Sequence, residues 1–218
     1  MSFALTVTDE QKKPIFYHPI FRDVAVKSAG LKALWLIEQC KPLAENVIVF
    51  FDEPSLSAYG SSAFLGVSES DVTESLDEVI SLAVQGGGFP GVHCCGNTDW
   101  GLIARTSTRI INFDAVDYME TIAIYSDKIA EFLERGGWLA WGAVPNTERV
   151  EVETVDHVRV RVREGVDLLA KAGIDPTLLK NRMILTPACG CAGLTPEQTE
   201  RVYRLLFDLD VEAKEGLV

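Results

Sequence analysis

The chain has 218 residues, of which 47% are hydrophobic, and it carries a formal net charge of −12 at pH 7. This acidic balance disfavours binding to nucleic acid, whose phosphates attract Lys and Arg, and to anionic membrane surfaces. The sequence contains no apolar run of about 18 residues and no signal-peptide pattern. We therefore expect a soluble cytoplasmic protein that binds neither nucleic acid nor membranes.

Short apolar segments alternate with longer amphipathic segments along the chain. The apolar segments predict strands over residues 3–7, 47–51, 91–95, 109–114, 138–142 and 183–186. The amphipathic segments predict helices over residues 21–38, 69–85, 99–104, 126–134, 153–171 and 196–206. This alternation is typical of a parallel sheet covered by helices, and we expect one domain that spans residues 1–218.

Polar or metal-binding residues follow the predicted strands at four equivalent positions, namely Asp52-Glu53, His93 to Cys95, Asp114 and Cys189. In parallel α/β folds the loops after the strands build the active site. A TIM-type (β/α)8 barrel needs eight strands, whereas about six βα units are visible here. The pattern therefore predicts an incomplete barrel, and an open doubly wound sheet is the alternative.

The His93-Cys94-Cys95 triplet has the spacing of a chelating pair. Residues two apart on a strand point to the same face, so His93 and Cys95 can bind one ion while Cys94 faces the helices. Cys189 lies in TPACGC at the end of the last predicted strand, and parallel closure of the sheet would bring it beside the pair. One imidazole and two thiolates suit Zn²⁺.

Asp114 ends the apolar stretch RIINF, and we expect its carboxylate to be an exchangeable fourth ligand. If it leaves, a substrate thiol takes its position on the zinc and loses its proton. Three other interpretations remain open: a buried thiol cluster with a hydrogen-bonded histidine, a closed structural zinc site, and Cys191 as the ligand in place of Cys189.

The segments GVHCCGN, RIINFDA and TPACG resemble the zinc motif of the cobalamin-independent methionine synthase catalytic domain and of the uroporphyrinogen decarboxylase-like methyltransferases. The resemblance implies a (β/α)8 barrel, a zinc ion held by His93, Cys95, Asp114 and Cys189, and methyl transfer to a small thiol, homocysteine. VIVFFDEPSL resembles the family strand that ends in Asp-Glu-Pro. This implies that Asp52 lies near the amino group of homocysteine and that Glu53 supports substrate binding.

The chain also departs from the family pattern. Its first residues resemble an internal strand, so we expect the family's N-terminal strands to be missing. A misassigned start, a gene fragment, or completion by a second copy or a completing chain would each explain this. Folate-using members carry a histidine near the position of Ala143, and they have a large additional N-terminal half that is absent here. These departures favour the short, core-type branch, whose members take the methyl group from a methyl-corrinoid (cobalamin) protein, and methyltetrahydrofolate is the alternative donor.

The leading hypothesis is thus a zinc-dependent thiol methyltransferase that makes methionine, with Asp52 and Asp114 as its catalytic carboxylates. A second hypothesis is a non-catalytic barrel fragment that binds zinc or a partner through an exposed sheet edge. A third is a uroporphyrinogen decarboxylase-like enzyme, which is weakened because such enzymes do not need the histidine and cysteine set.

Overall fold

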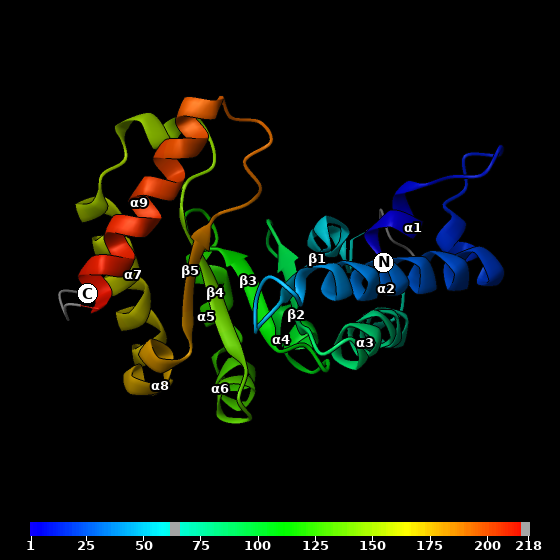
Figure 1. The fold of residues 1–218 in the computed structure, drawn as a ribbon. Coiled ribbons are helices and arrows are strands. Elements are labelled where there is room, and N and C mark those ends of the chain that lie inside the picture. The colour runs from blue at the N-terminus through cyan, green and yellow to red at the C-terminus, as the bar shows by residue number, and fades with distance from the viewer. Residues whose placement is uncertain (62–65, 215–218) are drawn as a thin grey trace. The chain divides into compact units, whose positions relative to one another are not determined.

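The computed structural model describes residues 1–61 and 66–214 (Figure 1). The strands are β1 (Ile48–Asp52), β2 (Phe89–Cys94), β3 (Ile110–Asp114), β4 (Trp138–Val144) and β5 (Met183–Pro187). The α-helices are α1 (Ser2–Thr6), α2 (Pro19–Cys40), α3 (Glu69–Gln85), α4 (Trp100–Ala104), α5 (Met119–Ala123), α6 (Ser126–Glu134), α7 (Val155–Lys171), α8 (Pro176–Asn181) and α9 (Pro196–Lys214). Short 3₁₀ helices are η1 (Ile15–Tyr17), η2 (Pro54–Ala58) and η4 (Glu148–Val152).

The five strands form a parallel sheet in the order β1-β2-β3-β4-β5, so each strand neighbours the next one along the chain. In the β1–β2 pair Asp52 lies opposite His93, and in the β4–β5 pair Val144 lies opposite Pro187. The carboxyl ends of neighbouring parallel strands therefore lie at the same edge. The predicted parallel α/β architecture is confirmed.

One predicted strand is wrong, because residues 3–7 fall in helix α1. A five-residue apolar run does not distinguish a strand from a short buried helix. Here Ala4 and Leu5 are buried together with Phe16 and Ala25, a pair of adjacent positions that a helix can bury and an alternating strand cannot. The short helices α5 and α8 were not predicted, and each is shorter than the two turns that a periodic pattern needs to show itself.

The chain folds into two compact units. Unit 1 comprises Met1–Cys94 and Thr98–Ile111, and unit 2 comprises Cys95–Asn97 and Asn112–Val218. The single domain expected from the sequence stays a prediction. None of the helices in the described part of the chain combines the length and the apolarity that crossing a bilayer requires.

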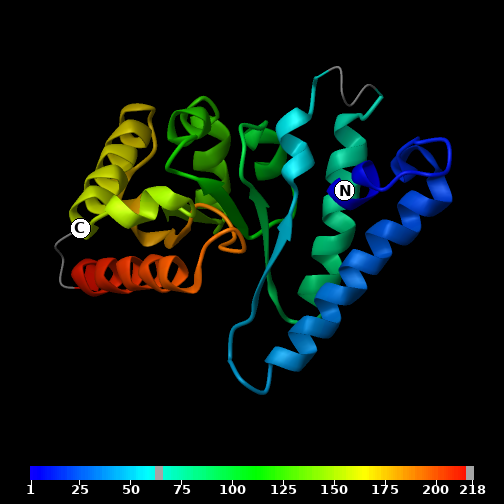
Figure 2. The same ribbon diagram turned by 90° about the horizontal axis from the view of Figure 1, so that it is seen from above.

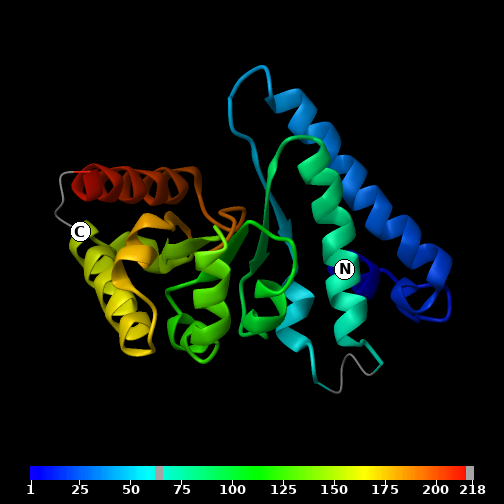
Figure 3. The ribbon, with the colours of Figure 1, turned by 90° about the horizontal axis from the view of Figure 1, so that it is seen from below.

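In unit 1 the long helices α2 and α3 lie side by side (Figures 2 and 3). Their close approach depends on Gly30, because a Cβ atom at this position would overlap a methyl carbon of Leu82. α2 buries Val26, Ala33 and Ile37 along with this glycine. Small residues on α2 thus let the larger aliphatic residues of α3 pack against its backbone.

In unit 2 the helices α7 and α9 enclose an aliphatic core. Val158 and Val162 of α7 and Val202 and Leu209 of α9 are buried there, together with Val144 at the end of β4. These residues recur at the three- and four-residue spacing that places side chains on one helical face. The core supports the ends of β4 and β5, where one of the predicted metal ligands lies.

Candidate metal centre

The structure brings His93, Cys95 and Cys189 together. One ligand atom from each, a ring nitrogen or a sulfur, lies within 4.8 Å of the other two. His93 is buried, whereas both cysteines are partly accessible. The group that the His-x-Cys spacing and the distant cysteine predicted is therefore present, with one buried and two partly accessible residues.

Neither of the neighbouring cysteines, Cys94 and Cys191, belongs to this group. Cys94, between His93 and Cys95, is completely buried and is not among the three clustered residues. Cys191, two residues after Cys189, is not among them either, and burial raises the pKa of its thiol. The structure thus favours Cys189 over Cys191 as the ligand from the last strand.

Unit 2 holds the segment around Cys189 through close backbone contacts. Gly142 of β4 is essential here, because a Cβ atom on it would lie 2.7 Å from the Cα atom of Ala188. The Ala188 N–H donates to the Val144 carbonyl at 2.8 Å, and the Asn146 amide donates to the Gly190 carbonyl at 3.0 Å. The residues on both sides of Cys189 are therefore tied to the end of β4.

A zinc ion fits this group by the chemistry and spacing of its donors. Ligand atoms of a tetrahedral zinc ion lie roughly 3.3–3.8 Å apart when the bonds are about 2.0–2.3 Å long. The three donors all lie within 4.8 Å of one another, about 1 Å above the upper end of that spacing. Thiolate and imidazole together suit zinc better than Ca²⁺ or Mg²⁺, which prefer oxygen ligands.

Asp114, the predicted fourth ligand, is buried at the end of β3 but is not among the clustered residues. One of its oxygens accepts hydrogen bonds from the Val116 N–H at 2.8 Å and the Asp117 N–H at 3.0 Å. Burial raises the pKa of Asp114, and these two N–H groups oppose that effect. The structure therefore shows a carboxylate that stabilises the turn after β3, and its role as a metal ligand stays a prediction.

The two carboxylates of the Asp-Glu-Pro segment have different surroundings. Asp52 is exposed, whereas Glu53 is buried and holds an ammonium group. The Oε1 atom of Glu53 lies 2.5 Å from the Met1 ammonium nitrogen, and its Oε2 atom accepts the Ser2 N–H at 2.6 Å and the Ser2 hydroxyl. The Glu53 N–H donates to the His93 carbonyl at 2.8 Å, so this carboxylate is fixed next to a predicted ligand.

Asn112 of β3 is a buried polar residue that the sequence analysis did not single out. Its amide donates to the Ala140 carbonyl at 2.8 Å and to the Thr186 hydroxyl at 3.0 Å. It therefore links β3 to β4 and to β5, three residues before Cys189. The sequence signal for Asn112 is a single amide side chain between apolar neighbours on a strand. A buried amide needs hydrogen-bond partners, so such a residue indicates a link to neighbouring segments.

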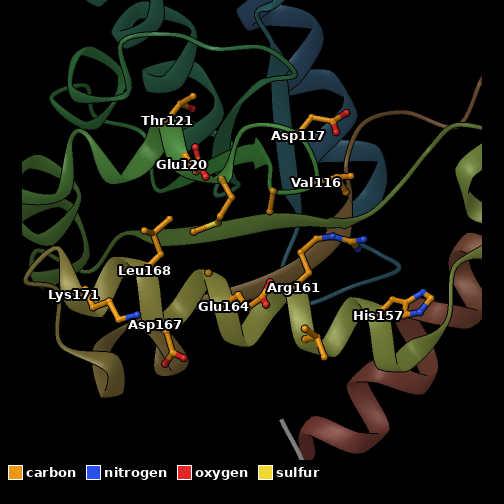
Figure 4. Close-up of a pocket in the computed structure, with 14 residues that line it drawn as sticks. Val116, Asp117, Glu120, Thr121, His157, Arg161, Glu164, Asp167, Leu168 and Lys171 are labelled. Atoms are coloured by element: carbon orange, nitrogen blue, oxygen red, sulfur yellow. The ribbon is translucent and has the colours of Figure 1, made fainter.

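Unit 2 also contains an open cavity of about 780 Å³ between α5 and α7. Figure 4 shows Asp117, Glu120 and Thr121 on one side of it and Arg161 and Glu164 of α7 on the other. The predicted site residues do not line this cavity. The side chains that line the cavity include both acidic and basic groups. Two of these lining residues form ion pairs with residues outside the lining, Asp117 with Arg149 and Arg161 with Glu153.

Neither a comparison of the chain with protein-family models nor a search of the curated proteins gives a match. The resemblance to zinc methyltransferases therefore rests on the motifs alone. What the structure itself supports is narrower: a parallel α/β fold with a His93-Cys95-Cys189 group that could hold a metal ion, zinc being compatible with it.

Proposed function

We propose that this protein is a zinc-dependent methyltransferase that transfers a methyl group to the sulfur of a small thiol, homocysteine. The observation that carries the proposal is the convergence of His93, Cys95 and Cys189 within 4.8 Å. Three protein donors, two of them on partly accessible residues, match a catalytic zinc site, which keeps one position for substrate, better than a closed structural site with four protein ligands.

Zinc bound to these residues would keep the substrate thiol deprotonated at neutral pH, where a free thiol with a pKa of about 8.5 is mostly protonated. The chain's own residues would hold the substrate in place. In the reaction, the new carbon–sulfur bond forms as the bond between the methyl group and the donor breaks. The donor leaves with the bonding electron pair.

We assign the amino group of homocysteine to the Asp-Glu-Pro segment, with Glu53 as its main partner. Glu53 already holds an ammonium group, that of Met1, and its backbone is hydrogen-bonded to His93. Asp52 is exposed, so its charge is screened by water more strongly. Binding of substrate to Glu53 requires that the Met1 ammonium group leave the carboxylate.

We propose a methyl-corrinoid as the donor rather than methyltetrahydrofolate. A methyl-corrinoid would supply the methyl group without needing a proton on its leaving atom, whereas the nitrogen of a folate would need to be protonated as it leaves. Ala143, at the position where the folate-using enzymes carry a histidine, is completely buried and has no proton to give. This argument favours the corrinoid because its departure needs no acid at this position.

We also propose that the sheet belongs to a (β/α)8 barrel. The sequential order of its parallel strands is the order that a barrel requires, whereas a doubly wound sheet reverses direction at a switch point. Five strands are three fewer than a closed barrel contains.

Zinc content of the purified protein tests the metal site. We expect about one zinc per chain, and severe loss of zinc in Cys95→Ala and Cys189→Ala. The chain offers matched controls one or two residues away, since Cys94→Ala and Cys191→Ala remove a thiol without removing a predicted ligand. Equal zinc retention in all four variants would contradict the site.

Methyl transfer from methylcobalamin to homocysteine tests the reaction, with methyltetrahydrofolate as the alternative donor. 4-Mercaptobutanoate, which is homocysteine without its amino group, tests the role of Glu53. We expect Glu53→Gln to raise KM for homocysteine but not for this analogue, and Asp52→Asn to have a smaller effect. Zinc binding without alkylation of either thiol would leave a metal site and refute the methyltransferase.

A further inference from the structure

Helix α2 is apolar on two sides, only one of which is covered within unit 1. Its covered side packs against α3 through Val26, Gly30, Ala33 and Ile37. On the other side six large apolar residues are exposed: Ile20 (67%), Phe21 (49%), Val24 (54%), Leu31 (55%), Trp35 (56%) and Leu36 (38%). A helix with one solvated side normally carries polar residues there, so this side has the composition of an interface.

Four of these residues form a straight stripe along the helix. At 3.6 residues per turn, Ile20, Val24, Leu31 and Trp35 fall within an arc of about 60°, and the stripe is about 22 Å long at 1.5 Å per residue. Lys27 borders the stripe, but its ammonium group pairs with Asp23 and with Glu78 of α3, at 3.0 Å from the latter. This cation beside the stripe is therefore neutralised within the same unit.

The stripe is symmetric about its midpoint, which falls between Lys27 and Ser28. Two apolar residues precede this point and two follow it. When two copies of α2 are placed antiparallel about a twofold axis there, Val24 meets Leu31 of the second copy, and Ile20 meets Trp35. Ser28 and Lys27 flank the axis at equal distances, so that the small side chain of Ser28 leaves room beside Lys27 of the second copy where the two helices approach most closely.

We propose that the protein forms a homodimer through this face of α2. Self-complementarity is the property that a twofold interface requires, since the same patch serves both copies. The six exposed side chains present roughly 600 Å² per copy, if a fully exposed large apolar side chain contributes about 200 Å². Burial of all six side chains on both copies would remove roughly 1,200 Å², the lower limit of stable specific interfaces, and the four stripe residues contribute roughly 900 Å² of it. The dimer contact must therefore also cover Phe21 and Leu36, which lie outside the stripe.

Sedimentation velocity at increasing protein concentration tests the proposal. We expect a monomer–dimer equilibrium for the wild type, and at least a tenfold larger dissociation constant for Leu31→Glu, because this substitution buries two unpaired carboxylates beside the axis. Ile124→Glu is the matched control, since Ile124 is an equally large apolar residue that is 76% exposed outside the stripe. Circular dichroism and thermal unfolding establish that both variants remain folded.

Ser28→Cys locates the axis directly. We expect mild oxidation to give a covalent dimer of this variant, and no covalent dimer of the wild type or of Ser81→Cys, which places a cysteine on exposed α3 surface. A wild type that remains monomeric at all concentrations overturns the proposal. A dimer that survives Leu31→Glu, or that does not cross-link through residue 28, also overturns it, because the contact then lies elsewhere.

Discussion

Two carboxylates are buried at the ends of β1 and β3, and the structure compensates their negative charges in different ways. In unit 1, Glu53 pairs with the ammonium group of Met1 and accepts two hydrogen bonds from Ser2. In unit 2, Asp114 accepts two backbone N–H groups from the turn that follows it, and burial raises its pKa. The first carboxylate is compensated by an ammonium group in direct contact, whereas the second is compensated mainly by backbone dipoles and more weakly by the charge of Arg149.

The sequence alone does not distinguish the roles of Glu53 and Asp114, whereas the difference between their partners does. A carboxylate that holds an ammonium ion in a buried position is suited to recognise an amino group. A carboxylate whose partners are the N–H groups of its own turn is suited to shape a loop, and its charge is less well stabilised. Substitutions that remove the charge but keep the shape test the comparison.

Glu53→Gln should have the largest effect on stability. The amide keeps an acceptor for the Ser2 N–H but leaves the buried ammonium group of Met1 without its counter-ion, and breaking a buried pair in this way costs about 3–5 kcal/mol. Urea denaturation of this variant and of the exposed control Glu45→Gln measures the difference. If the loss in the free energy of unfolding is no larger than that of the control, the Met1 ammonium group is hydrated once Glu53 has lost its charge.

Ser2→Ala should reduce the stability of the protein by an intermediate amount. The Ser2 hydroxyl donates to Glu53 and accepts the Ser55 N–H at 3.0 Å, and both contacts are lost without any change of charge. Hydrogen bonds to charged groups contribute about 1.5–3 kcal/mol each, so we expect a loss in that range. Ser57→Ala, in the exposed 3₁₀ helix η2, is the control, and an equal loss in both variants would argue against a special role for Ser2.

Asp114→Asn should have the smallest effect on stability, and the size of this effect should depend on pH. Because the pKa of Asp114 is raised above its ordinary value of 3.8 in the folded state, its ionisation favours the unfolded chain. The stabilising contribution is fully present below 3.8 and is lost as pH rises through the folded-state pKa. Asparagine keeps the acceptor for the two N–H groups and stays neutral.

Denaturation curves at several pH values measure this effect. We expect Asp114→Asn to be at least as stable as the wild type at pH 7, and the difference between the two to shrink in acid. A variant that is less stable at neutral pH than in acid, relative to the wild type, would mean that the Asp114 carboxylate has a cationic partner such as a bound metal ion.

Much of the fold follows from patterns within the sequence. The apolar segments that became β1 to β5 and the periodic segments that became α2, α3, α6 and α7 were predicted within a few residues, whereas α9 was predicted to end at residue 206 and extends to Lys214. Strand alternation also predicted that Cys94 would be buried between its two neighbours. These predictions held because both periodicities are local properties of the backbone.

Other features were decided by tertiary contacts. The segment after Met1 is a helix because its amino end meets Glu53 and its apolar side meets Phe16, and neither partner is near in sequence. Tertiary contacts also decided which carboxylate holds a charge and which supports a turn, since Asp52, Glu53 and Asp114 are equivalent as residues at strand ends.

The sequence by itself determined which side chains can bind a metal ion, because His93 and Cys95 share a strand face at a spacing of two residues. Only the tertiary structure decided that Cys189, rather than Cys191, joins them. The selection depends on the contacts of Ala188 and Gly190 with β4, which lies more than 40 residues earlier in the chain. The physical reason is that the chemistry of a ligand is a property of one residue, whereas its position depends on the packing of distant segments.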